Sequence, residues 1–230
     1  MTGSNTSSKT EDRAPKVTVL FPVYNSASYL REAIDSILWQ TFPDFELLIM
    51  DNASTDEGPS IIRAYSDPRI RYVVNERNLG LAGSLNRGIQ LSRGTYIARM
   101  DADDITRPDR LARQVAFMDA NPDCGLCGGD MIKMQGDRRR RVRYPRGHER
   151  IRVTTLFHAP FAHPAIMMRR SVLLAHDLRY REDLRSLEDY DLWSRLVEKT
   201  RTENLPHVLL DYRCHAQQMS AEYSREIMRI

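Results

Sequence analysis

Residues 95–104, TYIARMDADD, join an apolar, β-prone run to three closely spaced carboxylates. Because side chains alternate along a strand, we expect Asp101 and Asp103 to point to one side and Asp104 to the other. Two carboxylates about 4 Å apart repel by about 1–4 kcal/mol at a surface-like dielectric. A hard divalent cation, which prefers oxygen ligands and completes its shell with water and substrate phosphates, removes that repulsion. The stretch therefore indicates either a metal and phosphate site or a solvated acidic loop, and the rest of the chain decides between them.

Strand and helix patterns alternate through the first half of the chain. Apolar runs that predict buried strands cover residues 16–23, 45–50, 70–74 and 95–100. Helical patterns cover residues 27–40, 59–65, 81–91, and a stretch from the capping signature at 106–109 to about 119. This order is typical of a parallel, doubly wound sheet with helices on both faces. Ligands of such sheets bind at the carboxyl ends of strands, so Tyr24-Asn25, Asp51-Asn52 and Asp101-Ala102-Asp103 are expected to share a site.

The second half of the chain is less regular. Strands are expected at about residues 125–133, 165–168 and 207–212, and helices at about 148–157 and 189–199. The basic run at 138–141, followed by Arg143, predicts a solvated loop, with contact to an anionic substrate or a membrane as the alternative. Neither an internal repeat nor a domain linker is evident in the sequence.

Length and composition bound the class of protein. The 230 residues suit one domain, and a net charge of +3 gives no support for a nucleic-acid binder. No stretch approaches the roughly 18 apolar residues of a membrane helix, and three cysteines favour a reducing compartment, so a cytoplasmic protein is expected. We expect a disordered polar tail at 1–14, one domain at 15–220 with halves at about 15–120 and 121–220, and a C-terminal tail at 221–230.

Residues 188–193, EDYDLW, place three acids around a predicted helix start. The helix dipole favours carboxylates there, so simple capping is one interpretation. The other is a general base that takes a proton from an attacking hydroxyl, and Asp189 or Glu188 fits that need because a base must not be neutralised by a metal. His163 and His215 are each either ordinary structural histidines or groups of the site, as a phosphate contact or metal ligand.

Other site classes have weaker support. Cys124 and Cys127 have the C-x-x-C spacing, and Cys214 with His215 would be their partners at a zinc site. Both cysteines lie at a glycine-rich strand, where small residues more often serve packing. The sequence has no G-x-G-x-x-G after the first strand and no G-x-x-x-x-G-K-[ST], so dinucleotide-dehydrogenase and P-loop functions lose their main support.

Eight short motifs then identify a resemblance. They are VTVLFPVYN at 17–25, SILWQTF at 36–42, DNASTD at 51–56, NLGLA at 78–82, ARMDADDI at 98–105, HPA at 163–165, EDYDLW at 188–193 and YRCH at 212–215. Each is weak alone, but in this order they resemble the family 2 glycosyltransferases. These are inverting enzymes with the GT-A fold, a Rossmann-like, mostly parallel α/β sheet, that use nucleotide-diphosphate sugars. The resemblance covers about residues 16–220, with the less regular second half on the acceptor side.

The resemblance implies that Pro22, Tyr24 and Asn25 line the nucleotide pocket and that position 52 meets the edge of the base. Relatives usually have two adjacent acids where this chain has Asp51-Asn52. Asparagine both accepts and donates hydrogen bonds, so Asn52 still suits a uracil or thymine imide. A UDP-sugar is therefore the favoured donor.

The resemblance also implies roles for the metal and acceptor sides. Asp103 would be the principal ligand of Mn²⁺ or Mg²⁺, which bridges the diphosphate and stabilises it as leaving group. Asp101 would meet the ribose or the metal, and His215 would complete the metal site. Asp189 would deprotonate the acceptor hydroxyl for direct displacement at the anomeric carbon, and His163 would lie near the acceptor or the diphosphate.

The expected function is thus transfer of a sugar to a glycan or lipid-linked acceptor in cell-surface polysaccharide synthesis, with peripheral association at the inner face of the membrane as a further hypothesis. A sugar-phosphate nucleotidyltransferase is an alternative, but it needs a glycine-rich, basic loop where this chain has YNSAS at 24–28. A non-catalytic nucleotide-sugar-binding module is another, and loss of the base or of the metal acids would favour it. Both are present in this sequence.

Overall fold

The computed structural model of the chain describes residues 13–184, 186–215 and 218. The expected tails at 1–14 and 221–230 lie outside these residues, except for Arg13 and Ala14. The domain boundaries therefore stay predictions.

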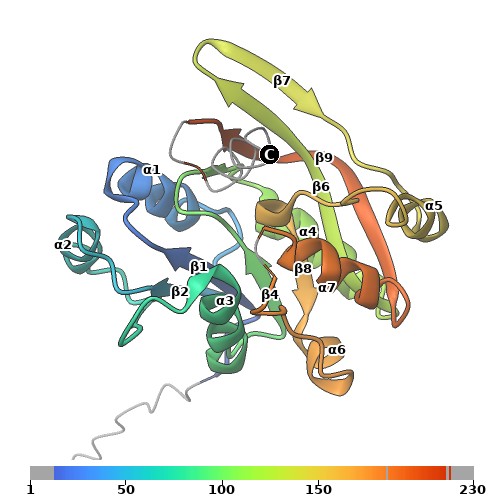
Figure 1. The fold of residues 1–230 in the computed structure, drawn as a ribbon, viewed down its shortest axis with the longest axis horizontal. Coiled ribbons are helices and arrows are strands. Elements are labelled where there is room, and N and C mark those ends of the chain that lie inside the picture. Colours follow the sequence, from blue (N-terminus) through green and yellow to red (C-terminus); the bar gives the residue numbers. More distant parts are fainter. Residues whose placement is uncertain (1–12, 185, 216–217, 219–230) are drawn as a thin grey trace, which may run out of the picture.

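One mixed sheet of nine strands runs through the described part of the chain (Figure 1). Its strands are β1 (Val17–Val23), β2 (Phe45–Asp51), β3 (Ile70–Val74), β4 (Tyr96–Arg99), β5 (Ile105–Thr106), β6 (Cys124–Gln135), β7 (Arg138–Val142), β8 (Met167–Arg169) and β9 (Arg201–Arg213). The order is β3-β2-β1-β4-β8-β6-β9-β5, and β7 pairs with β6. The first four strands in this order are parallel, β8 is antiparallel to both its neighbours, and β6 pairs in parallel with β9.

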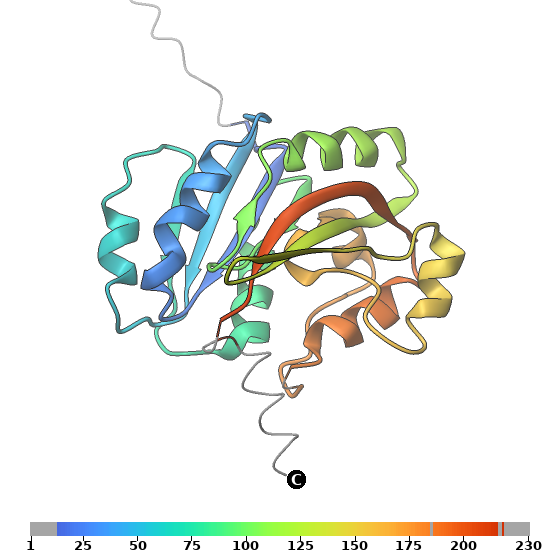
Figure 2. The same ribbon diagram turned by 90° about the horizontal axis from the view of Figure 1, so that it is seen from above.

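Helices cover both faces of the sheet (Figure 2). They are α1 (Ala27–Leu38), α2 (Gly58–Arg63), α3 (Gly80–Leu91), α4 (Arg110–Ala120), α5 (His148–Thr154), α6 (Arg170–Ala175) and α7 (Glu188–Leu196), with a 3₁₀ turn at His163–Ala165. Alternate residues of β1 divide the core. Phe21 packs in the cluster of α1, α2 and α4, whereas Leu20 packs in that of α3, α5, α6 and α7. The predicted α/β class and doubly wound first half are thus confirmed.

The second half differs from the prediction in several elements. Residues 138–142 form strand β7 and not a loop, because their backbone pairs with β6 from Gln135 to Met131. Strand β9 begins at Arg201 and not near 207, because it continues along β6 through three register shifts. Helix α6 has no counterpart in the expectation. Helix α4 begins at Arg110 because Thr106, the expected cap, belongs to β5 and pairs there with Leu210 of β9.

Candidate active site

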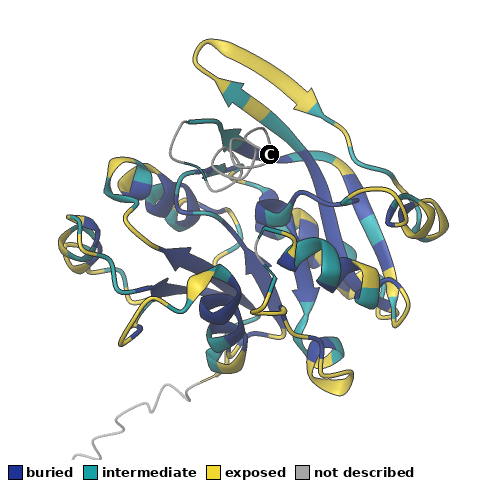
Figure 3. Ribbon diagram, viewed as in Figure 1, coloured by how far each residue is buried: buried dark blue, intermediate teal, exposed yellow. Residues whose placement is uncertain are grey.

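A single cleft of about 1060 Å³ opens at the carboxyl ends of β1, β2 and β4. It is lined by all ten residues that the sequence assigned to a site: Pro22, Tyr24, Asn25, Asn52, Asp101, Asp103, His163, Glu188, Asp189 and His215. The strands below it are buried, as Figure 3 shows in dark blue for β1, β2 and β4. The expected strand-end residues thus meet at one cleft, except for Asp51, which is buried and does not line it.

The loops after β1 and β2 hold each other at this edge. Asn25 has a left-handed backbone, with φ of +48°, a conformation that asparagine tolerates better than most residues. Its backbone N–H donates to Ser54 Oγ at 3.2 Å, and its Oδ1 accepts from the Thr55 backbone N–H at 2.9 Å. The loops after β1 and β2 are therefore hydrogen-bonded to each other at this edge of the cleft.

The three aspartates after β4 form one cluster. Strand β4 ends at Arg99, and a turn follows at residues 102–103. Asp101 and Asp103 line the cleft whereas the buried Asp104 does not, in line with the predicted division of the three acids. One ligand oxygen of each nevertheless lies within 4.8 Å of the others. Burial, and then the charges of the other two, raise the pKa of Asp104 well above its usual range. Burial also raises the pKa of Asp101, although Arg99 opposes this.

The end of β9 closes against this cluster from far along the chain. His215 Nε2 lies 2.8 Å from Asp103 Oδ2, and the Arg213 backbone N–H donates to Asp104 Oδ1 at 2.9 Å. The His215 ring also stacks on Tyr29, with centroids 4.7 Å apart. His215 thus lies next to the aspartate cluster, as predicted.

This donor set fits a hard divalent cation. The three carboxylates suit Mn²⁺ or Mg²⁺, which favour oxygen ligands, while His215 contacts Asp103 without belonging to the group whose ligand atoms meet. The buried Asp104 Oδ2 and His215 Nδ1 have no hydrogen-bond partner among the described residues. A cation inside the cluster would offset the mutual repulsion of these carboxylates, and burial already raises the pKa of Asp101 and of Asp104.

Arg99 is a functional candidate that the sequence analysis missed. Its side chain is 2% exposed, lines the cleft and donates from Nη1 to Asp101 Oδ2 at 2.5 Å. Its Nε is buried without a partner among the described residues. The signal available in the sequence was its place at the end of β4, directly before the acids.

The remaining residues of the cleft come from the start of α7, with Glu188 and Asp189, and from the 3₁₀ turn, with His163. Asp189 Oδ1 accepts its neighbour's backbone N–H, from Tyr190, at 2.7 Å, and Oδ2 lies 3.9 Å from His163 Nδ1. Burial raises the pKa of Asp189, and Arg99 opposes the shift. Burial also raises the pKa of Glu188. Burial, followed by Arg99, holds the pKa of His163 well below its usual range, so His163 is neutral.

The cysteines do not assemble a zinc site. Cys124 and Cys127 are buried in β6, and burial raises the pKa of Cys124 to about 11. The Cys214 backbone N–H donates to Met134 O, near the other end of β6. Among the described residues, the one group of three or more candidate metal ligands is the aspartate cluster.

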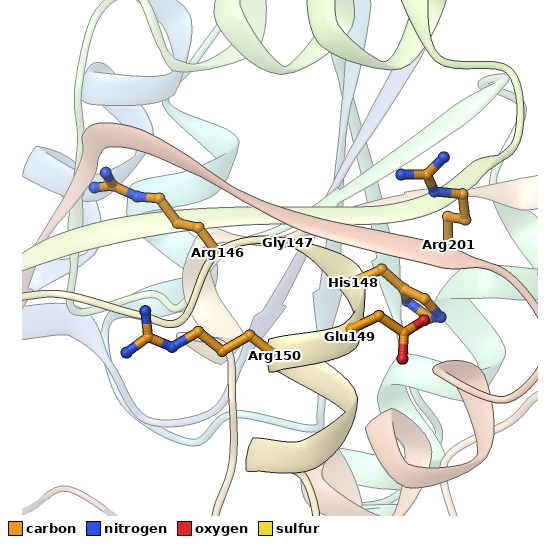
Figure 4. A pocket seen from close by; sticks show the side chains of 6 residues that line it. All are labelled: Arg146, Gly147, His148, Glu149, Arg150 and Arg201. Carbon is orange, nitrogen blue, oxygen red and sulfur yellow. The ribbon is translucent and has the colours of Figure 1, made fainter.

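A second hollow of about 630 Å³ lies at the start of α5 (Figure 4). Its lining consists of Arg146, Gly147, His148, Glu149, Arg150 and Arg201. Figure 4 shows the Arg146 and Arg150 side chains extending together to one side. This mainly basic lining suits an anionic surface and not a cation.

Comparison with known sequences adds a family assignment. The model of the family described as Glycosyl transferase family 2 matches residues 18–176. An uncharacterized glycosyltransferase of Haemophilus influenzae is 32% identical, over 94% of this chain and 70% of its own length. The O-antigen biosynthesis glycosyltransferase WbnJ of Escherichia coli is 34% identical, over 86% of this chain and 80% of its own.

Solved structures share the fold. Staphylococcus aureus TarS 1-349 in complex with UDP-GlcNAc has a TM-score of 0.78 and 23% identity, over 93% of this chain and 64% of that one. Mannosyltransferase PcManGT from Pyrobaculum calidifontis, in complex with GDP-Man and Mn²⁺, has a TM-score of 0.72 and 24% identity, over 94% and 61%. The chain thus spans less than two thirds of these structures' length. With the family model matching more than half of the chain and relatives above 30% identity, this chain belongs to glycosyl transferase family 2.

Proposed function

We propose that this protein transfers a sugar from a nucleotide-diphosphate donor, with a UDP-sugar favoured, to an acceptor hydroxyl with inversion at the anomeric carbon. One observation carries the proposal. One cleft brings together a cluster of aspartates after β4 that could hold a cation and a separate carboxylate, Asp189, at the start of α7. Direct displacement needs both a neutralised leaving group and a base that is not bound to the metal.

On the donor side, Asp101, Asp103, Asp104 and His215 would hold Mn²⁺ or Mg²⁺. When bound, such an ion offsets the charge that develops on the departing diphosphate. Pro22, Tyr24 and Asn25 would line the nucleotide pocket. The complexes of TarS with UDP-GlcNAc and of PcManGT with GDP-Man and Mn²⁺ support this class of donor.

On the acceptor side, Asp189 would take the proton of the attacking hydroxyl at Oδ2. The raised pKa of this partly buried carboxyl makes it a stronger base than a solvated aspartate. His163, being neutral, would contribute a hydrogen bond and not a charge, and its Nε2 is held 2.9 Å from Tyr180 Oη. Glu188 is 6% exposed and is the other carboxylate of this wall.

The two alternative functions have less support. The loop after β1 lacks the glycine-rich, basic character that a nucleotidyltransferase needs. A non-catalytic module has no need for a carboxylate whose pKa is raised beside a neutral histidine. The naming of WbnJ for O-antigen biosynthesis supports a glycan or lipid-linked acceptor in cell-surface polysaccharide synthesis.

The stereochemical outcome tests this proposal. We expect the protein, given Mn²⁺ and a panel of α-linked UDP-, GDP- and dTDP-sugars with short glycan acceptors, to release one nucleoside diphosphate and to form a β-linked product. Nuclear magnetic resonance of the purified product gives its anomeric configuration. An α-linked product, or a product that retains the phosphate linkage of a nucleotidyl transfer, would contradict the proposal.

We further propose a cytoplasmic location with peripheral attachment to the inner face of the membrane. Among the described residues, no helix is long and apolar enough to cross a bilayer. The β6–β7 hairpin projects from the body of the protein and is exposed near its tip (Figures 1 and 3). On β7, Arg139 and Arg141 pair with Asp211 and Asp130.

Arg138 and Arg140 lie on the other side of β7, exposed, and form no ion pair with another described residue. Each basic residue near an anionic surface contributes about 1 kcal/mol to binding. We therefore expect the double substitution Arg138→Glu/Arg140→Glu to weaken flotation with anionic liposomes at least about tenfold. The matched control, Arg31→Glu/Arg77→Glu, makes the same charge change elsewhere and should bind normally. Equal flotation of both variants would remove the proposal.

A further inference from the structure

Three asparagine amides, of which Asn52 and Asn75 are buried, form a hydrogen-bonded ladder beside the cleft at the ends of β2 and β3. Asn52 Nδ2 donates to Asn78 Oδ1 at 2.7 Å and to Gly80 O at 3.2 Å. Asn52 Oδ1 accepts from Asn75 Nδ2 at 2.9 Å and from the Leu79 backbone N–H at 2.8 Å. A side-chain amide has two donor hydrogens and two acceptor lone pairs. All four of these sites on Asn52 are used inside the protein.

Fixed donors and acceptors set the orientation of each amide in the ladder. The Leu79 backbone N–H can only donate, so it requires an oxygen of Asn52. The Gly80 backbone N–H donates to Asn78 Oδ1 at 2.8 Å, which places that oxygen toward the ladder. Arg87 Nη1 donates to Asn75 Oδ1 at 2.5 Å and fixes the third amide. If any of the three amides were rotated by 180°, its NH₂ group would face another N–H donor and lose that hydrogen bond.

The ladder leaves no acceptor at position 52 for a nucleobase. Asn52 is only 4% exposed, and a carboxylate there would face two oxygens, Asn78 Oδ1 and Gly80 O. Asp51 is also committed, since its Oδ1 accepts from the Ser54 backbone N–H and its Oδ2 from Tyr72 Oη, at 2.9 and 2.5 Å. The implied contact of Asn52 with the base edge is therefore not supported by its hydrogen bonding.

The same ladder presents a different group. Asn78 is exposed and lines the cleft, and its Oδ1 is held by two donors, from Asn52 and Gly80. Its Nδ2 forms no hydrogen bond with another described residue. An amide locked through its oxygen offers a pre-oriented N–H donor, which loses little freedom when a ligand binds.

We propose that Asn78, and not Asn52, discriminates the donor base, by donating from Nδ2 to the carbonyl oxygen at pyrimidine position 4 or purine position 6. Asn52 is a positioning residue that holds the loop of Asn75 to Gly80. The assignment rests on the proposed function and deepens it. Uracil and guanine carry a carbonyl at pyrimidine position 4 or purine position 6, where cytosine and adenine carry an amino group. The site should therefore bind UDP better than CDP, and GDP better than ADP.

The substitution Asn78→Asp tests the assignment with minimal change of shape. The aspartate keeps an oxygen for the Asn52 and Gly80 donors and replaces only the Nδ2 donor by an acceptor. We expect the ratio of CDP to UDP dissociation constants, measured by calorimetry with Mn²⁺, to fall by about 10- to 100-fold. The ADP-to-GDP ratio should fall in the same direction. A residue that only supports the loop would weaken all four diphosphates alike and leave both ratios unchanged.

Asn52→Asp is the matched comparison, because it breaks the ladder without removing the Asn78 donor. It should weaken all four diphosphates together and lower the unfolding temperature. Unchanged base ratios in Asn78→Asp would overturn the assignment alone, while the unaltered protein still bound a nucleotide. If the unaltered protein bound none of the four diphosphates, the proposed function would fail, and the assignment with it.

Discussion

We expect Asp103→Asn to lower the rate of sugar transfer by about 100- to 1000-fold, the range found when one charge-stabilising group is removed from a transition state. The substitution preserves the shape of the side chain but removes a charge from the cluster of Asp101, Asp103 and Asp104. It also replaces the carboxylate that lies 2.8 Å from His215 Nε2. Transfer rates at rising Mn²⁺ concentrations measure the effect, and the concentration for half-maximal rate should rise.

The control for this variant is Asp137→Asn, which makes the same chemical change at the exposed turn of the β6–β7 hairpin. It should retain the rate and metal dependence of the unaltered protein. An Asp103→Asn protein that is folded by circular dichroism and keeps both properties would show that the cluster is only an acidic turn.

Asp189→Asn is expected to lower kcat by about 100- to 10,000-fold while leaving nucleotide binding nearly unchanged. The amide keeps an oxygen for the Tyr190 backbone N–H but cannot accept a proton from the acceptor hydroxyl. Glu188→Gln is the matched comparison on the same turn of α7. If Glu188→Gln caused the larger loss, the base would be Glu188 and the assignment of Asp189 would be wrong.

The pH dependence of the rate follows from the same carboxylate. The base acts only when ionised, and burial raises the pKa of Asp189 above its usual range. The rate should therefore fall as the pH decreases through this raised pKa, at a higher pH than for a solvated aspartate. The acidic limb of kcat against pH measures it, and its disappearance in Asp189→Asn would link it to this residue.

The donor half of the fold was predictable because its signals are local. Strands β1, β2 and β4 are short apolar runs that end at polar residues, and the rule that ligands bind at the carboxyl ends of parallel strands brings those ends together. Pro22, Tyr24, Asn25, Asn52, Asp101 and Asp103, which lie at or near these ends, consequently line one cleft. The rule does not place His163, Glu188, Asp189 and His215, which line the same cleft from other elements. The resemblance supplied their roles, which local pattern alone left open.

Features that depend on distant contacts were not predictable in the same way. The closeness of the three acids depends on β4 ending at Arg99, after which the chain turns. The arginine run of β7 has no strand pattern of its own and is ordered by pairing with β6. The role of Asn52 depends on the loop of Asn75 to Gly80, whose side chains and backbone together use all of its hydrogen-bonding capacity. None of these effects is visible in a single stretch of sequence.

Isothermal titration of the unaltered protein with UDP, GDP and dTDP, each with Mn²⁺ and with chelator, shows whether the cleft is a metal-dependent nucleotide site. We expect saturable binding of at least one nucleotide, UDP above all, that is lost or strongly weakened without the metal. Binding of none of the three, or equal affinity with and without Mn²⁺, would contradict it.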